Sequence, residues 1–309
     1  MIYEPGMHTF HTSPPTLERP PQRVVSLVPS LTESLFDLGA GAAVVGVTDY
    51  CVHPAESLAR LPRLGGTKNP DVDKIIALAP DLVLANWEEN TRPTVEALEA
   101  AGIPVWVTCP RSVRAALADL WTLAGLFETP AAALRLKSLE NAVDWATAAA
   151  QNLKQVRYFC PIWYNPPDDG PVDAGGAEDS GDWWMTFNAD TYAHSILSLC
   201  GGENVFAHRA RRYPLAADLG RGAEQAPDGR DTRYPRLGIE ELRAAQPELI
   251  LLPDEPYAFT AREKLRLTEL LAGVPAADLG RIFLVGGDLI TWHGTRLGRA
   301  LAELPHYFE

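Results

Sequence analysis

Aromatic side chains gather in the segments that follow predicted β-strands in this chain of 309 residues. In open α/β sheets such segments lie beyond the carboxyl ends of the strands, where these folds bind their ligands. A preformed cleft lined by aromatic rings suits a large, flat and partly apolar ligand. Any single tryptophan also fits ordinary packing, so the indication comes from the common placement. The residues are Tyr50, Trp87, Trp163, Tyr164, Trp183, Trp184, Tyr257 and Trp292.

Histidines and acids fall in the same segments and raise the question of a metal site. Such sites commonly show a short regular spacing, for example two histidines one helical turn apart, and none occurs here. The four cysteines are scattered without a C-x-x-C pair, which favours small buried residues. We therefore expect no metal held directly by the protein. His293, in the segment TWHGTR, is the histidine best placed to touch a ligand.

Two charged segments leave alternatives open. The basic segment HRARRYP, residues 208–214, stands out in a chain of formal charge −13. It either meets an anionic group of a ligand or pairs with the acidic run at 166–182. That run is Gly-, Asp- and Pro-rich and predicts a solvated insertion or a lid over the cleft.

Several classes of protein are excluded by what the sequence lacks. An acidic chain has no basic footprint for nucleic acid, and no apolar run is long enough to span a membrane. G-x-S-x-G, the P-loop and a strand-linked G-x-G-x-x-G are all absent, so we expect a binding protein without catalytic residues.

A repeated phrase reveals how these residues are positioned. DKIIALAPDLVL at 73–84 recurs as EELRAAQPELIL at 240–251, and strands alternate with helices in the same order around both. This alternation predicts two similar α/β lobes, each a mostly parallel sheet flanked by helices. At the first helix, Ser30 and Glu33 match a capping box. The predicted strands are 23–28, 43–48, 81–85 and 103–108, then 156–164, 203–206, 248–252 and 281–287.

The domain boundaries follow from the same pattern. We expect an extended lead-in at 1–22, an N-terminal lobe at 23–111, connecting helices at 112–155 and a C-terminal lobe at 156–309. The connector from Pro130 is rich in Ala, Leu, Lys and Glu and has no internal Gly or Pro. It predicts a rigid rod of roughly 35 Å rather than a flexible hinge.

At this point the chain resembles a known family. The segments RVVSLVPSLTESLFDLGAG, VVGVTDYCVHP, DVDKIIALAPDLVLA and VEALEAAGIPVWV, with the long connector, are similar to substrate-binding proteins of cobalamin and iron-chelate ABC transporters. These are periplasmic binding proteins with a helical backbone. The resemblance, over residues 23–308, implies a cleft between two rigidly joined lobes that takes a corrinoid or a ferric chelate.

The resemblance also implies roles for individual residues. Asp73 and Glu240 match the acids with which the family docks on the two halves of its permease dimer. Stabilisation of the helix dipole is the simpler explanation for an acid at that position, and both can hold together. The predicted ligand contacts are Tyr50 and Trp87 in the first lobe, Trp163, Trp184, Tyr257 and Trp292 in the second, and His293.

Two rival functions and the cellular side stay open. The same architecture could serve a metal-handling enzyme with its site at His293, Asp254 and Glu255, or a cytoplasmic ligand sensor. The family works outside the cytoplasm, but residues 1–22 lack the basic start and apolar core of a secretory signal. Beyond a cobalt or iron carried by the ligand itself, we expect no cofactor.

Overall fold

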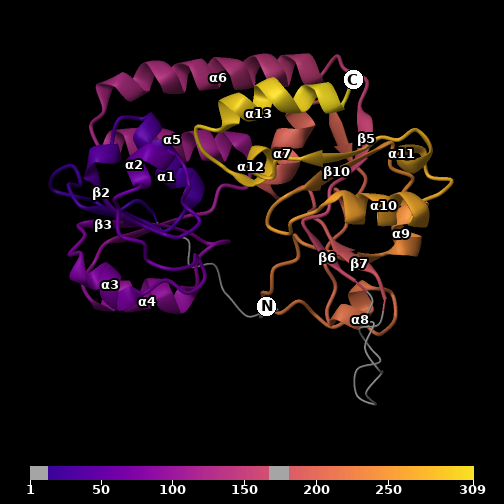
Figure 1. Cartoon of the computed structure of the whole chain (residues 1–309), viewed down its shortest axis with the longest axis horizontal. Coiled ribbons are helices and arrows are strands. Elements are labelled where there is room, and N and C mark those ends of the chain that lie inside the picture. Colours follow the sequence, from indigo (N-terminus) through magenta and orange to yellow (C-terminus); the bar gives the residue numbers. More distant parts are fainter. Residues whose placement is uncertain (1–12, 167–180) are drawn as a thin grey trace. The chain divides into compact units, whose positions relative to one another are not determined.

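The computed structural model describes residues 13–166 and 181–309 (Figure 1). The chain divides into two compact units. Among the described residues, the N-terminal unit contains 13–145 together with the short segment 292–299, and the C-terminal unit contains the described part of 146–291 and 300–309. The boundary departs from our predicted lobes, which placed all of 156–309 in the second lobe.

A four-stranded parallel sheet in the order β2-β1-β3-β4 forms the centre of the N-terminal unit. Its apolar residues are buried on both faces, as expected of a parallel sheet covered by helices. The strands are β1 (Val24–Ser26), β2 (Val44–Val47), β3 (Leu82–Asn86) and β4 (Val105–Thr108). The helices are α1 (Pro29–Asp37), α2 (Ala55–Leu58), α3 (Val72–Ala77), α4 (Arg92–Ala100) and α5 (Val113–Leu126), with a 3-10 turn at Gly41–Ala43.

The first helix corrects one local prediction. Helix α1 begins at Pro29, and Val28 is its N-cap without any side-chain hydrogen bond. Ser30 therefore lies inside the helix, where its backbone is already helical, and Glu33 binds Arg296 instead of capping the helix. Proline at the first helical position supplies the helical φ, so the predicted capping box is wrong.

The main sheet of the C-terminal unit has the order β11-β10-β5-β8, again fully parallel. In order of appearance along the chain, both sheets read second, first, third, fourth strand, so the predicted duplication is confirmed at the level of topology. The strands are β5 (Val156–Phe159), β8 (Gly202–Asn204), β10 (Leu249–Pro253) and β11 (Ile282–Val285). The helices are α7 (Tyr192–Leu199), α8 (Leu215–Asp218), α9 (Ile239–Ala245), α10 (Ala261–Leu270), α11 (Pro275–Asp278), α12 (Asp288–Thr291) and α13 (Leu297–Glu303), with a 3-10 turn at Leu304–Tyr307.

A second, antiparallel sheet in this unit was not predicted. It pairs β6 (Trp163–Asn165) with β7 (Trp183–Met185), and β7 with β9 (Arg236–Gly238). Each strand has three residues, which is too short for a periodic signal in the sequence. Most of the predicted acidic insertion, 167–180, lies outside the described residues.

Helix α6 (Pro130–Ala150) is the predicted rod. Its 21 residues correspond to about 32 Å at 1.5 Å per residue. None of the helices in the described ranges is both long and apolar enough to cross a membrane.

Candidate functional site

The loop after β2, at the carboxyl edge of the N-terminal sheet, carries the predicted ligand contact Tyr50 and, three residues later, His53. Arg63 Nη1 donates to the carbonyl oxygens of Thr48 (2.9 Å) and Cys51 (2.7 Å) and so anchors this loop. Tyr50, at the tip, is 63% exposed, and His53 is also exposed. An anchored backbone that presents an exposed phenol ring is a suitable arrangement for contact with a ligand.

Trp292 lies beside this loop, in the N-terminal unit and not in the second lobe as we predicted. Its ring meets that of His53 edge-on, with centroids 6.0 Å apart. The guanidinium of Arg296 lies 4.6 Å above the Trp292 ring and donates two hydrogen bonds to Glu33, at 2.8 and 2.6 Å. Because this bidentate pair is nearly buried, it fixes the segment, and with it the indole.

The same segment carries His293 into the interior. Asn86 Nδ2 donates to His293 Nε2 at 3.1 Å, at the carboxyl end of β3. Burial lowers the pKa of His293 to about 4, against a smaller opposing effect of Glu88, so the imidazole is neutral near pH 7. The predicted ligand contact at His293 therefore does not fit this placement: the side chain is 6% exposed and holds the segment in place.

An acid-sensitive fold is the first testable consequence. Between the ordinary pKa of about 6.5 and a native pKa of about 4, the unfolded chain binds a proton at His293 that the native protein does not. The contribution of His293 to stability should be complete above pH 6.5 and decline toward pH 4, by at most about 3 kcal/mol. Urea unfolding of the wild type and His293→Gln across this range measures the effect.

The comparison with His293→Gln is needed because other groups make stability depend on pH in the opposite direction. Burial raises the pKa of Asp119 to about 7 and of Asp218 to about 6, which favours the native state as the pH falls. Subtracting the two profiles cancels these groups. Parallel profiles for wild type and His293→Gln would contradict a neutral, buried His293.

Trp87 follows β3 but is only 5% exposed and packs in the core of the N-terminal unit. Its neighbours there include Leu27, Val95 and Val107. The prediction that Trp87 contacts the ligand is thus not supported by its placement, because a ring in the core has little surface accessible to a ligand. Its position directly after a strand did not indicate this burial.

In the C-terminal unit, Trp163 and Tyr257 are brought together. Trp163 begins β6, Tyr257 lies in the loop after β10, and their rings meet edge-on with centroids 5.6 Å apart. Tyr257 also packs against Tyr164 and Phe259, so this ring pair is rooted in the core. Both residues are half-buried, which leaves part of each ring available at the predicted ligand edge.

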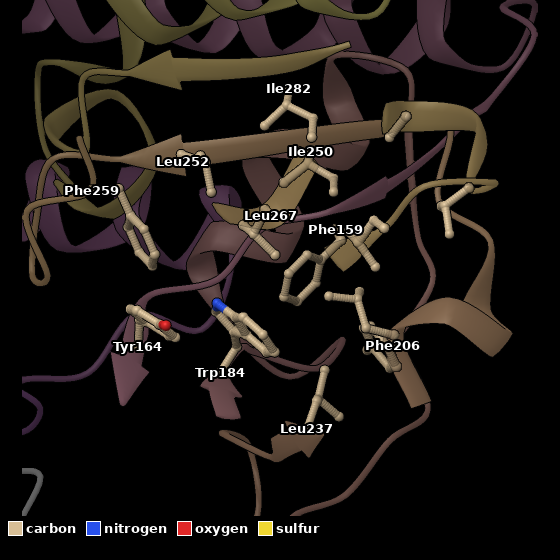
Figure 2. Close-up of a cluster of buried hydrophobic side chains, with 14 residues drawn as sticks. Phe159, Tyr164, Trp184, Phe206, Leu237, Ile250, Leu252, Phe259, Leu267 and Ile282 are labelled. Carbon is tan, nitrogen blue, oxygen red and sulfur yellow. The ribbon is translucent and has the colours of Figure 1, made fainter. Parts of the chain in front are cut away.

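Trp184 is a core residue, contrary to our prediction of a ligand contact. Its side chain is fully buried, and its ring stacks on Tyr164 with centroids 5.3 Å apart and an interplanar angle of 14°. Figure 2 shows both rings among Phe159, Leu237 and the residues of β10. Strand alternation explains the difference: Trp183 and Trp184 point to opposite faces of β7, and only one face is the core.

The acids of the rival metal site hold loops together instead. Asp254 Oδ1 accepts a hydrogen bond from the backbone N–H of Gly287 (2.7 Å), and Glu255 accepts one from the hydroxyl of Thr291 (3.3 Å). His293 belongs to the other unit. In the described part of the chain, no group of three His, Cys, Asp or Glu side chains is arranged to hold a metal ion.

Two roles were predicted for the basic segment 208–214: contact with an anionic ligand group, or pairing with the acidic run at 166–182. The observed partners of Arg209 correspond to neither. That guanidinium binds Asp218 at 2.9 Å and Glu241 at 2.7 Å inside the C-terminal unit. Arg211 and Arg230 lie over the ring of Tyr213, at 4.2 and 4.0 Å from its centroid. The acid of the insertion that the structure describes, Asp182, pairs with Arg266.

Asp73 and Glu240 occupy equivalent and exposed positions. Each is the second residue of its helix, α3 or α9. The N-cap of α3 is Asp71, which accepts a hydrogen bond from the backbone N–H of Lys74, so Asp73 is not needed as a cap. The Glu240 side chain is 80% exposed and pairs with Arg243.

Curated relatives of the chain are vitamin B12-binding proteins. One from Vibrio parahaemolyticus is 23% identical over 97% of this chain and 94% of its own length. Another from Yersinia pestis is 29% identical over 62% of this chain and 63% of its own length.

Solved structures with the same fold include the periplasmic vitamin B12-binding protein of Vibrio cholerae, with a TM-score of 0.69 and 18% identity over 94% of this chain and 97% of the other. A periplasmic haem-binding protein from Roseiflexus gives a TM-score of 0.66 and 22% identity over 93% and 97%. The pattern of the family described as periplasmic binding protein matches residues 24–289. The chain therefore belongs to the periplasmic binding protein family.

Proposed function

We propose that this protein captures a metal-containing macrocycle or chelate, a corrinoid or an iron chelate such as haem, and delivers it to an ABC permease. It does so without chemical conversion of the ligand. The single observation that carries the proposal is that each unit keeps accessible aromatic rings: the exposed Tyr50 and the half-buried Trp292 on one, and the half-buried pair Trp163 and Tyr257 on the other. Flat rings of this kind match a flat and partly apolar ligand.

The relatives support the ligand class. Proteins that match along most of the chain are named for binding vitamin B12, and structural neighbours are named for binding haem. Both ligands are large planar macrocycles around a metal ion. The rival enzyme has no support, since its proposed residues are engaged in holding loops.

Delivery to a permease follows from the family and from Asp73 and Glu240. Their equivalent places on duplicated helices suit a partner that is itself built from two similar halves. A ligand favours a docking-competent form only through interactions that differ between that form and the unliganded one.

Removing one aromatic ring from each edge tests the proposal. Tyr50→Ala and Trp163→Ala should each weaken binding of the preferred ligand about tenfold or more, because each ring is a contact anchor. Equilibrium dialysis with cobalamin, cobinamide, haem and ferric siderophores measures this, read by ligand absorbance. Trp145→Ala is the matched control, since it removes an exposed aromatic ring of α6 that is not among the predicted ligand contacts.

The outcomes separate the possibilities. Tight binding of one ligand class that both variants weaken, and the control does not, supports the proposal. A folded wild type that binds none of the ligands would contradict it.

A further inference from the structure

The antiparallel sheet β6-β7-β9 has one face in the core and one face outside it. Tyr164, Trp184 and Leu237 share the core face, as Figure 2 shows. Side chains alternate along a strand, and residues paired across strands share a face. Two rows therefore occupy the other face: Trp163, Met185 and Arg236, and then Asn165, Trp183 and Gly238.

This outer face carries Trp163, one of the predicted ligand contacts. It also carries two hydrogen-bond donors that have no partner among the described residues. Arg236 is 8% exposed, yet its Nη1 atom has no hydrogen-bond partner among the described residues. The indole Nε1 of Trp183, one row away on the neighbouring strand, is likewise buried and unpaired. Buried donors without partners are uncommon in native proteins, and two of them on one face of a sheet are explained if a bound group accepts from them.

Gly238 leaves room for such a group. A Cβ placed on Gly238 would meet no atom within 4 Å, so the position opposite Trp183 is open. Its φ is −83°, which any residue adopts, so the backbone conformation does not require glycine here. The sheet thus offers an open position flanked by a cationic donor and a neutral donor.

The charge around this position favours an anion. The carboxylate of Asp218 accepts from the backbone N–H of Arg236 and pairs with Arg209, so it is already engaged. Asp182, at the start of β7, is engaged by Arg266 and by the hydroxyl of Tyr164. No ion pair to the Arg236 guanidinium is present among the described residues, so its positive charge lacks a direct counter-ion.

We propose that this face is a subsite for an anionic oxygen group of the ligand, received by Arg236 Nη1 and Trp183 Nε1 over Gly238. The inference rests on the proposed function and deepens it: the ligand carries a carboxylate or phosphodiester beside the ring that stacks on Trp163. Arginine and an indole N–H are both pure donors, so the group must be an acceptor.

The experiment compares pairs of related ligands in which only one member carries such a group. Haem, with free propionates, is paired with its dimethyl ester, and cobalamin, with a phosphodiester, is paired with cobinamide, which lacks it. The wild type should bind the anionic member of the preferred pair about tenfold to a hundredfold more tightly, as expected for a charge-assisted hydrogen bond. Arg236→Met should lose this preference while its affinity for the member without the anionic group is unchanged.

Three further variants separate a ligand role from a structural one. Arg236→Lys keeps the charge and should retain part of the preference. Gly238→Ala fills the open position and should reduce binding of the anionic member without unfolding the protein. Arg209→Met breaks an internal ion pair close by and should lower stability while leaving the preference intact.

Each outcome is decisive. Equal preference in the wild type and Arg236→Met overturns the subsite, meaning that water alone satisfies the two donors, and leaves the proposed function standing. Binding of both members with equal affinity by the wild type also overturns it. Binding of none of the four probes by folded protein contradicts the proposed function and the subsite together.

Discussion

Reversal of both docking acids, Asp73→Lys with Glu240→Lys, should abolish ligand uptake while ligand affinity stays within about twofold of the wild type. Both side chains are exposed, and each lies in the first turn of its helix, so the fold does not depend on them. Loss of the favourable helix-dipole interaction should cost about 0.3–1 kcal/mol per site. If the acids dock on cationic groups of the permease, the two repulsive contacts created by lysine should cost several kcal/mol in docking.

Uptake by proteoliposomes that contain the cognate permease measures docking, and dialysis measures ligand affinity. Glu96→Lys with Glu269→Lys is the matched control, because it also reverses one exposed helix acid in each unit. Each reversal changes the charge by two, so both pairs take the formal charge from −13 to −9. Normal uptake by the Asp73 and Glu240 pair would sink the docking proposal, whereas equal loss in both pairs would point to net charge alone.

Trp184→Ala should lower the free energy of unfolding by about 3–5 kcal/mol, the range for removing a large aromatic side chain from a packed core. The ring is fully buried and stacks on Tyr164 within the cluster around β10 (Figure 2). Trp184→Phe should cost less, because it keeps a ring there and removes an indole N–H that has no partner.

Urea unfolding followed by far-UV circular dichroism checks this expectation, with Trp145→Ala as the control. Trp145 is 82% exposed, so its removal should change stability by no more than about 0.5 kcal/mol. Full stability of Trp184→Ala, together with lost ligand binding, would restore the ligand role that we first predicted for this residue.

The architecture was largely predictable because it is periodic. The alternation of β-branched runs with capped helices gave two similar α/β lobes and the rod α6, and the repeated phrase placed Asp73 and Glu240 at the same point of both lobes. These features are local: a strand or helix is specified by the residues within it, and a duplicated sequence specifies a duplicated topology. The structure confirms the shared strand order in both sheets.

The candidate site was only partly predictable, because adjacency in sequence does not fix the side to which a residue points. Trp183 and Trp184 are neighbours, yet one lies on the outer face of β7 and the other in the core. Three-residue strands leave no periodic signal from which to tell these faces apart. Trp87, directly after β3, is only 5% exposed, and its place after a strand did not indicate that burial.

The sequence by itself determined the fold class, the duplication, the connecting rod and the set of aromatic residues from which the ligand edges are drawn. Only the tertiary structure decided which of those rings stay accessible, that 292–299 packs with the N-terminal unit, and that Arg236 and Trp183 keep donors without a partner among the described residues. The physical reason is that burial and hydrogen-bond satisfaction depend on partners distant in the chain, such as Glu33 with Arg296 and Asn86 with His293. Local sequence patterns do not predict such pairs.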